Sequence, residues 1–152
     1  MAAEPALRRP SEDGLYEADY YAWVQAQVSA LERGDMAALD VTHLADEVAD
    51  LGRSEKHRVE SNLNALLLHL VKWMCQPDRR KGGWEVSIRE HRKRLLRDLA
   101  DSPSLKRHAS EIVAEEYDLA RRRAAVRMQP RDTIPEHCPF TIAQILDPEF
   151  LP

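Results

Sequence analysis

The fold class of this chain is decided by one stretch, Val59-Glu-Ser-Asn-Leu63-Asn-Ala-Leu66-Leu-Leu-His69-Leu70-Val-Lys-Trp73. Its large apolar residues recur at steps of three and four, which places them on one face of an α-helix. Similar stripes occur along the rest of the chain, and no run of alternating β-branched residues indicates a strand. Amphipathic helices bury their stripes against one another, so the sequence predicts an all-α helical bundle.

Glycine, proline and capping residues set the predicted helix boundaries. The five predicted helices cover residues 16–33, 41–51, 54–75, 84–100 and 103–128. Gly34 is the expected C-terminal stop of the first helix, and Asp40 is placed to cap the second. We expect a kink or break at Gly52, a helix start at Pro103, and a short C-terminal helical turn capped by Thr141.

The predicted core consists of the apolar faces of these helices and of the tail. The first two faces are Tyr16, Tyr20, Trp23, Val24, Val28 and Leu31, then Val41, Leu44, Val48 and Leu51. The later faces are Trp84, Ile88, His91, Leu95 and Leu99, then Leu105, Ile112 and Leu119. The tail adds Phe140, Ile142, Ile145, Leu146, Phe150 and Leu151, too many apolar groups to leave in water.

Length and composition restrict the class of protein. A chain of 152 residues is long enough for one domain, which we place at residues 16–152 behind a flexible arm over 1–15. With 43% hydrophobic and 32% charged residues, the composition is that of a globular protein. No stretch resembles a secretory signal or a membrane span, so we expect a cytoplasmic protein. Cys75 and Cys138 are then most simply free thiols, although the sequence does not exclude a disulfide between them.

Several short motifs, taken in order, resemble a known family. They are Tyr16-Glu-x-Asp-Tyr-Tyr-x-Trp23, Leu51-Gly-Arg-Ser-Glu-Lys56, His69-Leu-Val-Lys-Trp73 with Gln76-Pro77, Ile88-Arg-Glu90, Asp101-Ser-Pro-Ser-Leu105, Cys138-Pro-Phe-Thr141 and Leu146-Asp-Pro-Glu-Phe-Leu-Pro152. Together they resemble the bacterial domain of unknown function family 29 over nearly the whole chain. The resemblance implies an all-helical bacterial protein, and it implies no reaction and no catalytic residues.

The reactive patterns that the sequence offers are few. There is no glycine-rich phosphate loop, dinucleotide fingerprint or nucleophile elbow, so we predict no catalytic residue and no cofactor. His43 and Glu47 lie four residues apart, on one helical face, and His69 follows on the same stretch of chain. Bundles build metal centres from inward-facing Glu and His, so these three are the candidate metal ligands. The alternative interpretation is that His43 and Glu47 are a solvated surface pair and that His69 is a histidine at the edge of the core.

Positive charge is concentrated in two places. Eight basic residues lie between Arg79 and Arg97, and Arg121, Arg122, Arg123 and Arg127 form a second cluster. Among the eight, Arg89, Lys93 and Arg97 form a stripe at four-residue steps, which we call the basic stripe. It could dock an acidic protein partner or neutralise nucleic-acid phosphates. The net charge of -4 makes nucleic acid the weaker alternative.

The leading hypothesis is therefore a non-enzymatic interaction or regulatory module whose partner the sequence does not identify. Intact amphipathic helices, segregated surface charge and the lack of a reactive constellation support it. The alternatives are a metal-dependent bundle that uses His43, Glu47 and His69, and weak nucleic-acid binding through the basic stripe. A ligand pocket between the aromatic rings is a further alternative, because periodicity does not distinguish a packed core from a cavity.

Overall fold

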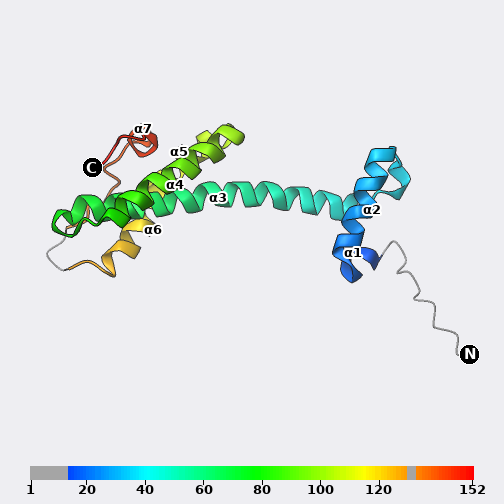
Figure 1. The fold of residues 1–152 in the computed structure, drawn as a ribbon, viewed down its shortest axis with the longest axis horizontal. Coiled ribbons are helices and arrows are strands. Elements are labelled where there is room, and N and C mark those ends of the chain that lie inside the picture. Colours follow the sequence, from blue (N-terminus) through cyan, green and yellow to red (C-terminus); the bar gives the residue numbers. More distant parts are fainter. Residues whose placement is uncertain (1–13, 130–132) are drawn as a thin grey trace, which may run out of the picture. The chain divides into compact units, whose positions relative to one another are not determined.

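The computed structural model describes residues 14–129 and 133–152. Its elements in chain order are α1 (Leu15–Ala18), α2 (Tyr20–Arg33), η2 (Met36–Ala38), α3 (Val41–Cys75), η3 (Pro77–Arg79), α4 (Gly82–Asp101), α5 (Leu105–Glu111), α6 (Val113–Ala125) and α7 (Ile142–Leu146) (Figure 1). No strand occurs in the described residues, which confirms the all-α prediction. Five of the seven α-helices found there have seven residues or more. The predicted arm over residues 1–15 lies almost entirely outside the described part of the chain.

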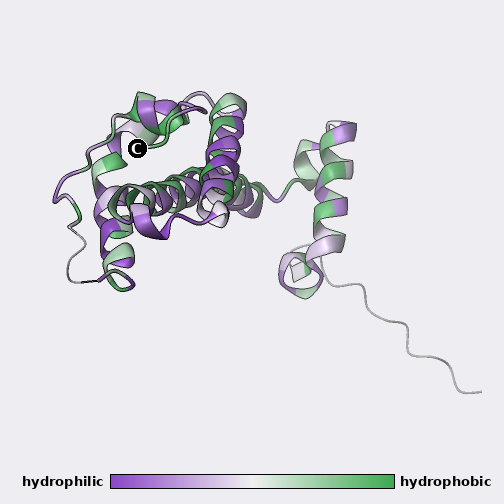
Figure 2. Cartoon of the chain, turned by 60° about the vertical axis from the view of Figure 1, so that its left-hand side comes forward, coloured by the Kyte–Doolittle hydropathy of each residue, from purple (hydrophilic) through white to green (hydrophobic). Residues whose placement is uncertain are grey.

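Contacts between residues divide the chain into two compact units, Met1–Gly52 and Arg53–Pro152. The boundary falls inside α3, so this helix contributes residues to both units. Each helix carries hydrophobic and hydrophilic residues side by side, as amphipathic packing requires (Figure 2). The division into one domain over residues 16–152 stays a prediction.

The first unit begins with a broken helix rather than the single one predicted. Asp19 ends α1 with extended backbone and caps α2, because its side chain accepts a hydrogen bond from the Ala22 N–H at 3.0 Å. Short acidic side chains compete for backbone N–H groups in this way, and the competition interrupts the helix. Gly34 ends α2 with a left-handed φ of 68°, as predicted. Asp40 caps α3 through the His43 N–H, also as predicted.

The apolar stripes predicted for the first unit are largely wrong. The residues that α2 buries are Trp23, Gln27 and Ala30. The predicted core residues left exposed are Tyr20, Val28 and Leu31 on α2, and Val41, Val48 and Leu51 on α3. Periodicity locates an apolar face, but only a packed neighbour decides whether that face is buried.

Helix α3 runs unbroken from Val41 to Cys75, so the predicted break at Gly52 is wrong. A single glycine costs a helix about 1 kcal/mol, which its neighbours and tertiary contacts can offset. The second half of α3 supplies the core of the second unit. Its fully buried residues are Val59, Leu63, Leu66, Leu67, Leu70 and Val71. These include the fold-deciding stripe except for Trp73, which is half-buried against the same core.

The other helices of the second unit complete that core. Helix α4 buries Ile88, Leu95 and Leu99, as its predicted face requires. The last predicted long helix is two helices, because the backbone of Ile112 turns between α5 and α6. Helix α6 buries Tyr117 and two alanines, whereas the predicted core residue Leu119 is exposed.

The tail is part of the core, as predicted. Phe140 and Ile145 are buried, and Leu146, Phe150 and Leu151 pack against the same cluster. Thr141 caps α7 in a capping box with Gln144. A buried cation also binds the tail. Arg92 on α4 is 2% exposed and donates hydrogen bonds to the main-chain oxygens of Ile145, Pro148 and Phe150.

Two sequence-based expectations concern the chain as a whole. Cys75 and Cys138 are both partly buried, and no disulfide joins them in the described structure. Among the described residues, no helix combines the length and the apolar character needed to cross a membrane.

Candidate functional site

The predicted metal ligand Glu47 lies in the first unit, where two tyrosines bind it. Tyr16 and Tyr20 each donate a hydroxyl hydrogen bond to its carboxylate, at 2.6 and 2.7 Å. The bond to Glu47 raises the pKa of Tyr16 to about 12. In return, the two donors hold the pKa of the Glu47 carboxyl below its usual range. Both carboxylate oxygens therefore join α1 and α2 to α3.

The second predicted ligand, His43, belongs to the same contact between helices. Its Nδ1 lies 2.6 Å from the Asp40 carboxylate, and its ring stacks on Tyr16 with centroids 3.9 Å apart. Asp40 also accepts a hydrogen bond from the Trp23 indole N–H at 3.1 Å. The bond with His43 lowers the pKa of Asp40. These contacts give His43 and Glu47 a role in packing the first unit.

The third predicted ligand, His69, lies in the second unit beside a different histidine. Its ring is nearly parallel to that of His91, with centroids 6.2 Å apart, and its buried Nδ1 has no hydrogen-bond partner among the described residues. Burial and the neighbouring Lys72 lower the pKa of His69 to about 4, so the ring is neutral at pH 7. In the described part of the chain, no three His, Cys, Asp or Glu side chains form a group suited to a metal ion.

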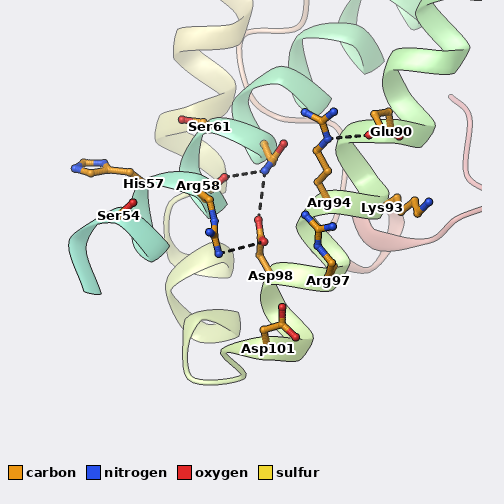
Figure 3. Close-up of a pocket in the computed structure, with 11 residues that line it drawn as sticks. Ser54, His57, Arg58, Ser61, Glu90, Lys93, Arg94, Arg97, Asp98 and Asp101 are labelled. Carbon is orange, nitrogen blue, oxygen red and sulfur yellow. Dashed lines mark hydrogen bonds and ion pairs between the residues drawn. The ribbon is translucent and has the colours of Figure 1, made fainter. Parts of the chain in front are cut away.

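A pocket of about 840 Å³ lies in the second unit between α3 and α4 (Figure 3). Its floor holds Asp98, whose side chain is 4% exposed. Asp98 accepts a hydrogen bond from Asn62 at 3.4 Å and lies 3.6 Å from the Arg58 guanidinium. Asn62 in turn bonds the ring of His91 at 3.1 Å. The pocket floor is thus a chain of polar groups that satisfy one another.

The walls of this pocket carry nearly balanced charge. The acidic lining residues are Glu90, Asp98 and Asp101, and the basic ones are Arg58, Lys93, Arg94 and Arg97. Arg94 pairs with Glu90 at 2.8 Å, as the dashed line in Figure 3 marks. Among the described residues, neither serine of the lining forms a hydrogen bond with His57. The His57 ring instead bonds the Glu60 carboxylate. The pocket therefore has neither a strong charge preference nor a nucleophile next to a base.

The three residues of the basic stripe have different neighbours. Lys93 and Arg97 line the pocket just described, whereas Arg89 lies outside that lining. Arg89 pairs with Glu85 one turn away, at 2.9 Å. The four-residue spacing places the three cations on one side of the helix. It does not reveal which of them a nearby carboxylate, such as that of Glu85, neutralises.

A family described as "Domain of unknown function DUF29" matches residues 15–151. No curated protein and no solved structure matches the chain.

Proposed function

This chain belongs to the DUF29 family, and we propose that it is a non-enzymatic interaction module that pairs with a second copy of itself through α3. The pairing face consists of Val41, Leu44, Val48 and Leu51, which we call the seam. The observation that supports the proposal is the exposure of this face. Val41 and Val48 are 65% exposed and Leu51 is 67% exposed.

The seam is distinct from the face of α3 that α1 and α2 occupy. Asp40, His43 and Glu47 make the contacts to those helices. The seam residues lie one position further along the helix, about 100° around its axis. Large apolar side chains on one ridge are unusual in a surface that meets only water. A partner that covers them is the economical explanation.

The spacing of the seam identifies the partner. Steps of three, four and three are those of the a and d positions of a coiled coil, with valine at both a positions and leucine at both d positions. Valine at a with leucine at d favours two strands. A ridge of this kind is complementary to a copy of itself, which is how most homodimers form. The next a and d positions are Glu55 and Arg58, which pair with each other, so the seam ends at Leu51.

The strength of the pairing follows from the seam's small size. Burying a large apolar side chain contributes about 1.5–3 kcal/mol. Three side chains per copy, each about two-thirds exposed, therefore contribute about 6–12 kcal/mol to a dimer. Association itself costs about 4–15 kcal/mol, so at most about 8 kcal/mol remains, which corresponds to a dissociation constant of about 1 µM or weaker. Such a module associates and separates as its concentration changes.

The test is sedimentation equilibrium of the full chain across its expected dissociation constant. Val48→Lys removes two apolar contacts and places two ammonium groups at the dimer axis, so it should weaken pairing by about 30-fold or more. The matched control is Val86→Lys on α4, because Val86 is 67% exposed and also lies on a helix. The control should pair like the parent chain.

Two results would overturn the proposal. One is a parent chain that stays monomeric up to about 1 mM, which would leave the seam less than about 4 kcal/mol of pairing free energy. The other is an equal loss of pairing in Val86→Lys, which would mean that added charge alone opposes association. Circular dichroism of each variant shows that the helices are retained, so a loss of pairing is not a loss of folding.

A further inference from the structure

A second pocket, of about 620 Å³, lies in the second unit where α3 ends, α4 begins and α6 ends. Five cations and a tryptophan dominate its lining: Lys72, Arg79, Arg80, Lys81, Arg127 and Trp84. We call it the basic pocket. Its lining includes one carboxylate, Asp78, so the pocket has an excess of four positive charges. Arg79, Arg80 and Lys81 are consecutive in the chain, and the fold adds Lys72 from α3 and Arg127 from beyond the end of α6.

No acidic side chain neutralises the cations of the basic pocket. In the described parts of the chain, none of the five forms an ion pair with an Asp or Glu, although Arg80 also donates a hydrogen bond to a Pro152 oxygen at 3.4 Å. Elsewhere in the same unit, Arg94 and Arg107 each pair with a glutamate one turn away. Like charges held together without partners raise the local potential and attract counter-ions.

Two of the five cations are held in place by aromatic rings. The Arg80 guanidinium lies 4.8 Å from the ring centre of Trp73, and its Nε donates to the Trp73 carbonyl at 3.0 Å. The Lys72 ammonium lies 5.2 Å from the ring centre of Trp84. Burial, Arg127 and Arg123 lower the pKa of Lys72, which agrees with a positive surrounding potential. Groups held in this way lose little freedom when a ligand binds.

The beginning of α4 adds to the same potential. Lys81 is the N-cap residue of this 20-residue helix, and its side chain makes no capping hydrogen bond. The next two residues are Gly82 and Gly83, and a Cβ built on either meets no atom within 4 Å. Their backbone is therefore open to an approaching group, and a helix N-terminus carries partial positive charge.

We propose that the basic pocket binds a compact ligand that carries two or more phosphate groups. Arginine guanidinium groups donate paired hydrogen bonds to phosphate oxygens, and lysine supplies a point charge. An excess of four charges exceeds what one phosphate neutralises but matches a di- or triphosphate group. The pocket's volume leaves room for such a group beside the Trp84 ring.

Isothermal titration of the full, untagged chain with tripolyphosphate tests this assignment. We expect saturable binding of one tripolyphosphate per chain, weakened by added salt. Arg127→Gln and Lys81→Gln each remove one exposed cation and should lower the affinity about tenfold. The matched control is Lys106→Gln, because Lys106 is exposed, carries the same charge and lies outside the lining. It should change the affinity less than twofold.

The outcomes separate the proposal from its rivals. No saturation at millimolar tripolyphosphate, or an equal loss with Lys106→Gln, overturns it. Tighter binding of a single-stranded oligonucleotide or of a polyglutamate peptide through the same residues would also overturn it. The preferred ligand of the pocket would then be an extended polymer and not a compact phosphate compound. Both variants change exposed side chains, and an unchanged circular dichroism spectrum shows that each remains folded.

Discussion

Replacing Arg92 by methionine should destabilise the second unit more than any change to a surface arginine. The guanidinium donates to main-chain oxygens of the tail at 2.8, 2.9 and 3.3 Å. A hydrogen bond from a charged donor contributes about 1.5–3 kcal/mol, so the two short bonds contribute about 3–6 kcal/mol. Burying the guanidinium opposes part of this gain, and the same burial lowers the pKa of Arg92. We expect a net loss of about 3 kcal/mol, or roughly 10 °C in the unfolding midpoint.

Urea and thermal unfolding, followed by circular dichroism, measure this loss. Arg89→Met is the matched control, since Arg89 lies on the same helix, is exposed and pairs only with Glu85 in the described residues. Its loss should stay within about 0.5 kcal/mol. Arg92→Lys should recover little stability, because one ammonium does not reproduce the planar fork of donors. If Arg92→Met costs no more than Arg89→Met, the tail does not depend on this cation and the reasoning is wrong.

Other expected outcomes concern the tail, the histidine and the basic stripe. Deleting residues 140–152 should lower the unfolding midpoint clearly, because the deletion removes buried Phe and Ile side chains; an unchanged midpoint would refute tail docking. Elemental analysis of untagged protein should find no stoichiometric metal, and one equivalent lost on His69→Ala would support the metal hypothesis. Stability should fall as pH drops from 7 toward 4, since the unfolded chain protonates His69 first, and His69→Gln should reduce that fall. Reversing Arg89, Lys93 and Arg97 to glutamate should change nucleic-acid binding little; submicromolar affinity at physiological salt, abolished by this change, would contradict the interaction-module hypothesis.

Local signals in the sequence predicted the local structure well. Gly34, Asp40 and Thr141 each mark a helix end through their own backbone or side-chain chemistry, and each does so in the structure. The tail was predicted to dock because its apolar content has no other stable place. Where a competing local interaction existed, as at Asp19, the prediction of a single helix was wrong.

Candidate sites were harder to predict than helices. The spacing of His43 and Glu47 suggested metal ligands. In the structure, both side chains contact aromatic residues of α1 and α2. The basic pocket was missed, although both of its charge clusters are visible in the sequence. No local signal states that Arg127 lies beside the loop that contains Arg79 and Lys81.

The sequence by itself determined the fold class, most helix boundaries and the core face of α3 from Val59 to Leu70, because helical period and capping depend on residues a few positions apart. Only the tertiary structure decided which apolar stripes are covered. The stripe that begins at Val59 meets other helices, whereas Val41, Val48 and Leu51 of the earlier stripe stay exposed. Burial and ion pairing depend on distant segments that meet in space, and a one-dimensional pattern does not contain that information.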